Sequence, residues 1–359
     1  MLIIHILTKG FTSGNGCAFL FPLIRYRSAL RDRGMDLYFF YDIQKRLYEC
    51  DLLIVESKFF SQEWSKSTDR VLEKFIHFRE KIAKVYYFDI SDSTGWPHAR
   101  VLPYVDRYFK NQLLKDKNLY LKPLYAHRIY TDYYYHQCQV TDLSELYSET
   151  IQDPQLLDKL AVGWNSGLAD YSLRGPYRSW LYRYFPYSFF LSEPRVFFPP
   201  APNRINDVSC RMGITYARNT VSWQRTQIKE MLRLRTPTDK LSRRQYYQEL
   251  VQSKIIVSPF GLGEITLKDF EVFLTGGLLL KPDMSHLETW PDFFRNQETM
   301  ITHRWDLTDL VDRIEEVLAS YKNYVSIAEE AQSFYKTYLV GSGSEYLFCD
   351  YFSKILQQK

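Results

Sequence analysis

The segment from Ser253 to Pro282 constrains the fold of this chain more than any other part of its sequence. It begins with an apolar run, Ser253–Phe260, that is typical of a buried strand, and continues through the turn Gly261–Gly263. A run with helical spacing follows, and Gly277–Pro282 then has the composition of a second buried strand. A strand, a tight turn, a helix and a strand form a βαβ unit, whose two strands lie parallel in one sheet.

The N-terminus of the helix in this unit predicts a phosphate site. It faces the carboxyl edge of the sheet, where unpaired backbone N–H groups and the helix dipole favour a negative charge. Lys268 lies in the first turn of the expected helix and adds a cation there. The segment therefore predicts a site for a nucleotide diphosphate.

Strand and helix signals also alternate through the N-terminal third of the chain. The expected strands are Leu2–Leu7, Met35–Tyr41, Asp51–Glu56 and Lys84–Ile90. The expected helices are Ala18–Arg33 and Ser61–Ala83. Strands that alternate with helices predict a parallel, Rossmann-like sheet.

The middle of the chain lacks this alternation. Tyr120–Tyr135 and Tyr171–Phe198 are rich in Tyr, Arg, Phe and Pro without a clear period, and prolines interrupt Pro194–Asn206, where we place a linker. The elements expected between this linker and the βαβ unit are a strand at Asp207–Tyr216 and helices at Val221–Arg235 and Ser242–Gln252. After the βαβ unit we expect a strand at Met300–Ile301 and helices at Leu307–Ser320, Tyr324–Tyr338 and Ser344–Gln357, the last two separated by Gly341–Gly343. We expect a Rossmann-like domain at 1–195, a second at 206–335, and a C-terminal helix within 336–359 that packs back toward the first domain.

Composition narrows the class of protein. Hydrophobic residues make up 45% of the 359 residues, as in a folded globular protein, and no apolar run approaches the ~18 residues of a membrane span. Met1–Leu7 reads as a first strand and not as a signal peptide. The five cysteines are scattered without Cys-x-x-Cys spacing, which favours a reducing cytoplasm and no zinc site. The net charge of +4 permits an anionic ligand but does not indicate nucleic acid.

Three segments carry a resemblance to a known family. They are Ser253–Phe260, Gly263–Glu271 and Lys281–Asp292, with a weaker match at Phe88–Gly95. The chain resembles glycosyltransferases of the GT-B architecture, with a group-1-type C-terminal domain, and is more distantly similar to α-1,3-fucosyltransferases. This resemblance implies an α/β protein in which two Rossmann-like domains face a cleft, followed by a helical tail.

The resemblance also assigns candidate donor-binding residues. In the fucosyltransferase motif a lysine contacts the donor diphosphate, and Lys268 matches it, whereas Leu267 replaces the glutamate that contacts the ribose. Glu264 and Glu271 are the remaining candidates; we expect Glu264 near the donor and Glu271 at the ribose. The other expected donor-binding residues are Arg218, with Arg225 as the reserve cation, and Ser258, Gly261 and Gly263, where the backbone can approach phosphates.

The acceptor hydroxyl needs a general base, for which Asp92 is the first candidate. It follows the strand Lys84–Ile90 at the carboxyl edge of the first sheet, although a loop aspartate can also cap a helix. Glu56 and His98 are the alternatives, and we expect His286 to hydrogen-bond in a loop near the donor. The Thr8–Gly16 loop follows the first strand, at an edge where ligands bind such sheets.

No Asp-x-Asp occurs in the sequence, which favours transfer without a metal ion and without any other cofactor. The predicted function is transfer of a sugar from a nucleotide-diphosphate sugar, GDP-linked slightly ahead of UDP-linked, to a glycan or glycoconjugate hydroxyl. The alternatives are a nucleotide-sugar epimerase or phosphorylase on the same architecture, a non-catalytic binding protein, and an RNA-binding protein that uses Tyr171–Arg195.

Overall fold

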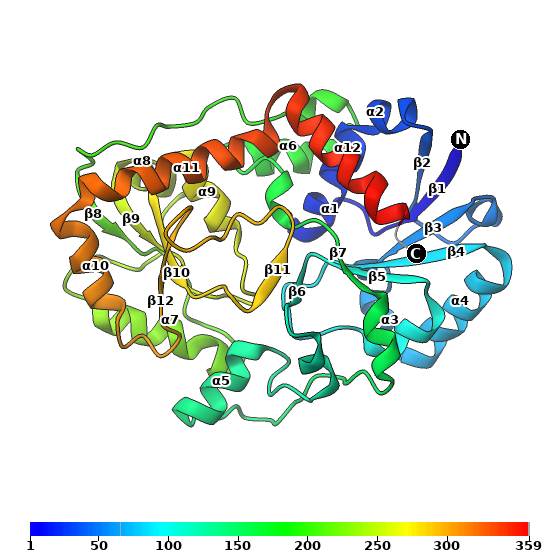
Figure 1. Cartoon of the computed structure of the whole chain (residues 1–359), viewed down its shortest axis with the longest axis horizontal. Coiled ribbons are helices and arrows are strands. Elements are labelled where there is room, and N and C mark those ends of the chain that lie inside the picture. The colour runs from blue at the N-terminus through cyan, green and yellow to red at the C-terminus, as the bar shows by residue number, and fades with distance from the viewer. Residues whose placement is uncertain (65, 358–359) are drawn as a thin grey trace.

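The computed structural model describes residues 1–64 and 66–357, and contains two parallel sheets that lie side by side (Figure 1). Residue 65, within the expected helix Ser61–Ala83, and residues 358–359, within the expected C-terminal segment, lie outside the described residues. Helices flank both sheets. The predicted α/β class with two Rossmann-like sheets is confirmed.

The first sheet has six parallel strands in the order β2-β1-β3-β4-β5-β7. They are β1 (Leu2–Leu7), β2 (Met35–Phe40), β3 (Leu52–Glu56), β4 (Lys84–Asp89), β5 (Arg107–Lys110) and β7 (Leu160–Val162). The first four were expected, because apolar runs such as Leu52–Val55 are buried between helices on both faces of the sheet. β5 and β7 were missed, because they are short and β5 begins and ends with a basic residue.

The helices between Gly14 and Tyr182 differ from expectation in their limits, and α5 among them packs on α7 (Asn219–Leu232) of the second half. The helices are α1 (Gly14–Arg25), α2 (Arg27–Asp32), α3 (Ser61–Trp64), α4 (Thr68–Lys81), α5 (Ile129–Cys138) and α6 (Gly175–Tyr182). Short 3₁₀ turns occur at η1 (Lys45–Tyr48), η2 (Ser57–Phe60), η3 (Ala99–Tyr104), η4 (Lys117–Leu121), η5 (Pro154–Lys159), η6 (Ser166–Leu168) and η7 (Ser188–Leu191). The expected helix Ala18–Arg33 begins earlier, since Ser13 caps it by accepting from the Gly16 N–H at 3.1 Å, and it divides at Tyr26. The two aromatic-rich segments contain α5 and α6 despite their lack of a period.

The second sheet has four parallel strands in the order β12-β10-β9-β8. They are β8 (Asn206–Ser209), β9 (Ser253–Val257), β10 (Leu278–Pro282) and β12 (Ile301–His303). Its helices are α7 (Asn219–Leu232), α8 (Arg243–Gln252), α9 (Leu267–Thr275) and α10 (Leu310–Ala319). The predicted βαβ unit is confirmed as β9, α9 and β10. The expected strand Asp207–Tyr216 was too long, because pairing with β9 stops at Ser209.

A two-stranded ribbon joins the two halves of the molecule. β6 (Gln112–Leu114) leaves the first sheet and pairs antiparallel with β11 (Leu287–Thr289) from the second half, with Gln112 opposite Thr289. The Asn165 side chain also donates to Thr289 Oγ1 at 3.1 Å. Backbone and side-chain hydrogen bonds therefore fix the distance between the sheets.

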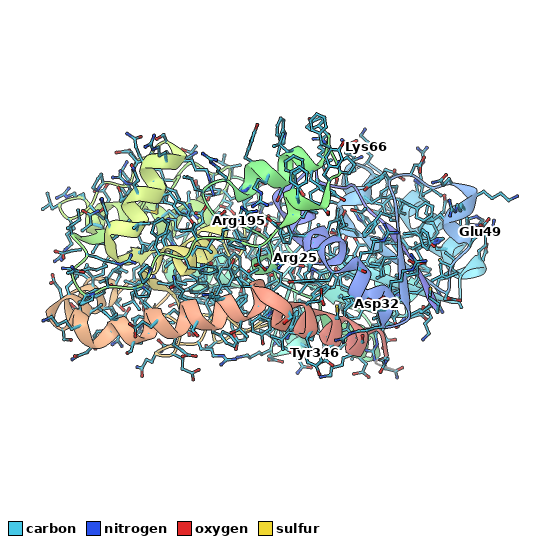
Figure 2. All side chains as sticks on the ribbon, turned by 90° about the horizontal axis from the view of Figure 1, so that it is seen from above. Arg25, Asp32, Glu49, Lys66, Arg195 and Tyr346 are labelled. Atoms are coloured by element: carbon cyan, nitrogen blue, oxygen red, sulfur yellow. The ribbon has the colours of Figure 1, made fainter. Side chains whose placement is uncertain are left out.

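The C-terminal helices span both halves (Figure 2). α11 (Tyr321–Leu339) packs on α9 and β10, and α12 (Gly341–Gln357) lies against the first sheet. Tyr86 Oη donates to the Leu356 carbonyl at 3.3 Å, and the Phe348 ring contacts Trp164 at 5.3 Å between centroids. The glycine-rich break that the sequence predicts was misplaced, since α12 begins at Gly341, whose φ is +75°.

Phe348→Ala should destabilise the protein by about 3–5 kcal/mol, because a fully buried ring is lost and a cavity remains against Trp164. The measurement is chemical denaturation followed by fluorescence. Tyr346→Ala on the same helix is the control: this ring is 60% exposed, and its loss should cost about 0.5 kcal/mol or less. Equal losses for the two variants would contradict the packing of α12 on the first sheet.

Candidate functional site

Loops from the carboxyl ends of the two sheets meet at one point. β4 leads into the loop that carries Asp92, and β9 leads into the turn that carries Gly263. A Cβ built on Gly263 would lie 2.0 Å from the Asp92 carbonyl oxygen, so only glycine fits there. The Thr94 N–H donates to Glu264 Oε2 at 3.0 Å. The two halves thus touch through backbone and a buried carboxylate.

Asp269 organises the start of α9. Its Oδ2 accepts from the Thr266 N–H at 2.8 Å and completes a capping box, and its Oδ1 accepts from Ser258 Oγ at 2.5 Å. The ammonium group of Lys281 lies 3.0 Å from the same carboxylate, and both side chains are fully buried. Burial lowers the pKa of Lys281, which the negative charge of Asp269 opposes. This ion pair fixes the turn between β9 and α9 from inside the protein.

A pocket of about 300 Å³, which we call the basic pocket, lies beside this turn. It is lined by Arg211, Met212, Gly213, Arg225, Lys240, Leu241, Tyr246, Ser258, Pro259, Thr266 and Lys268. Arg211 forms an ion pair with Glu249 at 2.6 Å, whereas Arg225 donates only to carbonyls, at 2.7 Å to Phe260 and 3.0 Å to Gly213. No carboxylate is among the residues described as lining the pocket. Its charge is therefore positive and suits an anionic ligand.

Lys268 is the cation next to the α9 N-terminus. Its Nζ donates to the carbonyls of Arg211 and Val257, at 3.5 Å for the latter, and it has no described carboxylate partner. Burial lowers the pKa of Lys268 to about 8, and the positive charge of Arg225 contributes. A diphosphate in the basic pocket would supply the missing counter-charge.

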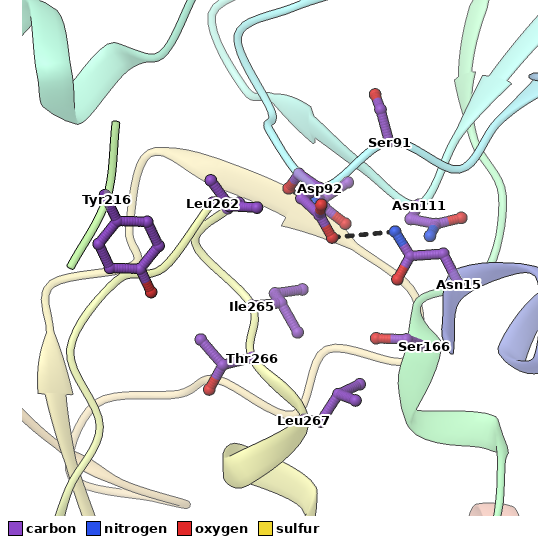
Figure 3. A pocket seen from close by; sticks show the side chains of 12 residues that line it. Asn15, Ser91, Asp92, Asn111, Ser166, Tyr216, Leu262, Ile265, Thr266 and Leu267 are labelled. Carbon is purple, nitrogen blue, oxygen red and sulfur yellow. Dashed lines mark hydrogen bonds between the residues drawn. The ribbon is translucent and has the colours of Figure 1, made fainter. Parts of the chain in front are cut away.

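A second pocket of about 280 Å³ lies between the two halves, and we call it the interdomain pocket (Figure 3). It is lined by Asn15, Ser91, Asp92, Asn111, Gln112, Ser166, Tyr216, Leu262, Gly263, Ile265, Thr266 and Leu267. The Asp92 carboxylate accepts from Asn15 Nδ2 at 2.9 Å, which orients it at the pocket wall (Figure 3). Thr266 lines both pockets. A ligand can therefore place its anionic part in the basic pocket and its remainder beside Asp92.

The structure brings several predicted site residues together. Lys268 and Ser258 line the basic pocket, and Asp92 and Gly263 line the interdomain pocket. A Cβ on Gly261 would lie 3.2 Å from Arg225 Nη2, so this glycine leaves room for a guanidinium group of the basic pocket.

Glu264 is fully buried at the contact between the halves. One carboxylate oxygen accepts from Thr94, while Oε1 has no described hydrogen-bond partner and lies 4.0 Å from His286 Nε2. Burial lowers the pKa of His286, and the negative charge of Glu264 opposes this shift. Neither His286 nitrogen has a described partner. This pair lines neither pocket, and the donor roles predicted for Glu264 and His286 stay predictions.

Arg218 and Glu271 lie outside both pockets. Arg218 is the N-cap residue before α7 and has a buried Nη1 without a described partner. Burial lowers the pKa of His127 to about 4, and the positive charge of Arg218 adds to this shift. Glu271 accepts from Arg243 and from the Tyr246 hydroxyl, each at 3.0 Å, and burial raises its pKa. Arg225, the reserve cation, lines the basic pocket instead, and the roles of Arg218 in the diphosphate site and of Glu271 at the ribose stay predictions.

The two alternative bases also lie elsewhere. Glu56 is fully buried and accepts from Thr8 Oγ1 and the Lys9 N–H, each at 3.1 Å, so it anchors the loop after β1. His98 lies 2.7 Å from the Tyr87 hydroxyl and lines a separate cavity. Of the three candidate bases, Asp92 alone lines the interdomain pocket.

Sequence reasoning missed several lining residues. Arg211 follows β8 at a carboxyl end, a position that could have indicated it. Asn15 falls within Thr8–Gly16, which was expected to be a ligand-binding loop, but it lies in the first turn of α1. Lys240 precedes α8 in a loop, and Gln112 comes from a strand that the sequence did not reveal. Their positions depend on contacts between distant segments.

No family model and no curated protein matches the sequence. Solved structures similar to the chain include HepE of Anabaena in complex with UDP, at 10% identity over 99% of both chains and a TM-score of 0.48. An alpha-glucosyltransferase in complex with UDP-glucose and DNA aligns at 13% identity over 99% of both chains, with a TM-score of 0.43. S. aureus MnaA in complex with UDP aligns at 11% identity over 100% of this chain and 99% of its own, with a TM-score of 0.40.

Among the described residues, no three His, Cys, Asp or Glu side chains are grouped closely enough to hold a metal ion. The expectation of transfer without a metal stays a prediction, because the presence of Arg225 and Lys268 is compatible with it but does not test it.

The pH dependence of anion binding should report on Lys268. A bound anion favours the charged form of the lysine and raises its pKa, so binding takes up a proton only above the free-protein pKa of about 8. Affinity for a nucleotide sugar should thus be flat below about pH 8 and fall above it by up to about tenfold per pH unit. Isothermal titration calorimetry at several pH values measures this.

Lys268→Arg is the matched control for this titration, because a guanidinium group stays charged throughout the range. Its affinity should lack the decrease above about pH 8. Any titration of the ligand itself would appear in both proteins, so an identical decrease in the variant would remove Lys268 from the anion site.

Proposed function

We propose that this protein is a glycosyltransferase that transfers a sugar from a nucleotide-diphosphate sugar to a hydroxyl group of a glycan or glycoconjugate. The observation that carries the proposal is the pair of adjoining pockets that share Thr266. The basic pocket suits the diphosphate, and the interdomain pocket suits the sugar and the acceptor hydroxyl. The resemblance of Gly263–Glu271 to the donor motif supports the same assignment.

The residues of the basic pocket match what the leaving group requires. As the bond from the sugar to the diphosphate breaks, negative charge develops on the diphosphate, and fixed positive groups stabilise it. Lys268, Arg225 and the N-terminus of α9 supply such groups without a metal ion. Charge-assisted hydrogen bonds of about 1.5–3 kcal/mol each, together with about 0.3–1 kcal/mol from the helix dipole, are sufficient in scale.

In this proposal Asp92 acts as the general base. Its carboxylate faces the interdomain pocket, and Asn15 holds it through a hydrogen bond at 2.9 Å. An acceptor hydroxyl in this pocket would transfer its proton to Asp92 as its oxygen attacks the anomeric carbon from the side opposite the diphosphate. This arrangement gives inversion at that carbon.

The donor and the role of Lys268 are tested together. A thermal-shift screen with GDP, UDP, dTDP and CMP should show stabilisation by one base, GDP or UDP, because a ligand that binds only the native state raises its stability. With the corresponding nucleotide sugar, Lys268→Ala should reduce kcat/KM by a hundredfold or more, about 3 kcal/mol, while the variant folds normally.

The assay is carried out in excess chelator, in which we expect full activity. Lys322→Ala, at an exposed position on α11, is the matched control and should retain wild-type turnover. Near-normal turnover of Lys268→Ala would exclude this lysine, and loss of activity in chelator that manganese or magnesium restores would exclude metal independence.

Asp92→Asn tests the base. The amide keeps the size of the side chain and can still accept from Asn15, so folding and nucleotide affinity should be unchanged. Transfer should fall by about 10²–10⁴-fold, the usual contribution of general-base catalysis. Single-turnover transfer and nucleotide titration measure the two quantities separately, and transfer at the normal rate would show that Asp92 has only a structural role. Turnover of the nucleotide sugar without any acceptor would favour the epimerase alternative.

A further inference from the structure

Exposed aromatic rings are concentrated in the segment Leu173–Val196. Of the nine exposed Phe, Tyr and Trp side chains among the described residues, six lie here, at 48–62% exposure. They are Tyr177, Trp180, Tyr184, Phe185, Tyr187 and Phe189, and we call them the aromatic face. Leu173 and Val196 flank them and are also exposed. Contiguous exposed apolar surface of this kind marks an interaction site.

The segment holds the aromatic face in a defined structure. Arg178, on the inner side of α6, donates to the Phe189 carbonyl at 2.6 Å and lies 3.6 Å from Asp170. The Tyr182 ring packs on Phe11 with 4.8 Å between centroids. Figure 2 shows the green α6 region at the edge of the molecule, with ring-bearing side chains directed away from the protein body. The outer rings are therefore presented to solvent by an anchored segment.

The unpaired charge around the aromatic face is positive. Arg174, Arg183 and Arg195 are exposed and have no described carboxylate partner. Glu193 is the single carboxylate of the segment, and Arg25 neutralises it at 2.6 Å. The face thus combines apolar rings with basic groups and carries no uncompensated negative charge from its own residues.

A pocket of about 260 Å³ borders this face. It is lined by Ser172, Leu173, Arg174, Arg195, Val196, Phe198 and Tyr247. Two guanidinium groups accompany mainly apolar lining residues, a combination that suits an amphiphile with a phosphate group.

We propose that the aromatic face docks the protein on the surface of an anionic phospholipid bilayer. Trp and Tyr rings favour the interface between headgroups and acyl chains, Phe rings enter the acyl boundary, and arginines bind headgroup phosphates. No helix of the described chain is long and apolar enough to cross a membrane, so the contact lies at the surface. Single-stranded RNA, the other candidate partner, would require cations that follow a phosphate backbone along a groove, whereas here the arginines flank an exposed apolar face.

The docking surface is connected to the candidate site. Phe11, which packs on Tyr182, lies just before α1, and Asn15 in the first turn of α1 lines the interdomain pocket. The membrane contact itself does not depend on the proposed function and is tested separately from it.

The test is co-sedimentation of the full chain with vesicles of phosphatidylcholine, with and without phosphatidylglycerol. We expect binding only to the anionic vesicles, weakened by salt. A triple variant should bind the anionic vesicles more weakly when Gln replaces Arg174, Arg183 and Arg195. We expect its partition coefficient to fall by about fivefold per arginine, and thus by about a hundredfold. A second triple variant, in which Ser replaces Trp180, Phe185 and Phe189, should have a partition coefficient that is lower by about tenfold or more.

The controls are Tyr346→Ser and Arg233→Gln, exposed side chains outside this face, which should bind as the wild type does. Unchanged thermal stability and an unchanged nucleotide-induced thermal shift would show that the variants are folded, whatever their vesicle binding. Absence of binding to anionic vesicles, or equal binding by all variants, would overturn the proposal. Two further results would overturn it if the protein does not bind vesicles. One is tight binding of single-stranded RNA, and the other is a concentration-dependent dimer, in each case abolished by the same substitutions.

Discussion

The buried ion pair between Asp269 and Lys281 is the constraint on which the candidate donor site depends. An isolated charge in this position would be strongly unfavourable, so each side chain requires the other. The same carboxylate caps α9 through Thr266 and accepts from Ser258, which joins the end of β9, the start of α9 and the strand β10 in one network. Because these contacts lie beneath the turn, the groups that face the basic pocket are positioned without any ligand.

This arrangement separates two kinds of cation in the second half of the protein. Lys281 is matched by a carboxylate and has a structural role, whereas Lys268 and Arg225 are held by backbone carbonyls and keep their positive charge uncompensated. Burial lowers the pKa values of Lys268 and Arg225, because desolvation disfavours their charged forms. A site of this type gains most from an anion that carries several negative oxygens.

The sequence predicted the parts of the fold that local patterns determine. The apolar strands of the two sheets, the βαβ unit and the position of Lys268 beside a helix N-terminus follow from periodicity and from the glycine turn. β5 and β6 were not predictable, because their pairing is decided by distant partners such as Leu287–Thr289 and not by their own composition. The sequence also suggested Arg218 where Arg225, about two helical turns further along, lines the basic pocket, because the packing of α7 decides which side chain faces it. The sequence showed that the segment around α6 is rich in aromatic residues, but not whether their rings lie in the core or on the surface. That depends on how Arg178 and Tyr182 pack against the rest of the protein.

The return of α12 to the first sheet has a consequence for how the chain acquires its structure during synthesis. The core that contains Tyr86 and Trp164 is completed by side chains from Gly341–Gln357. This segment follows the whole second sheet in the sequence. A ribosome releases these residues after those of both sheets, so the N-terminal half emerges with part of its apolar surface uncovered, and this surface stays uncovered while the second sheet is made. The two halves are therefore not sequential folding units. The first sheet is synthesised before the second, but its core is completed after the second sheet has been made.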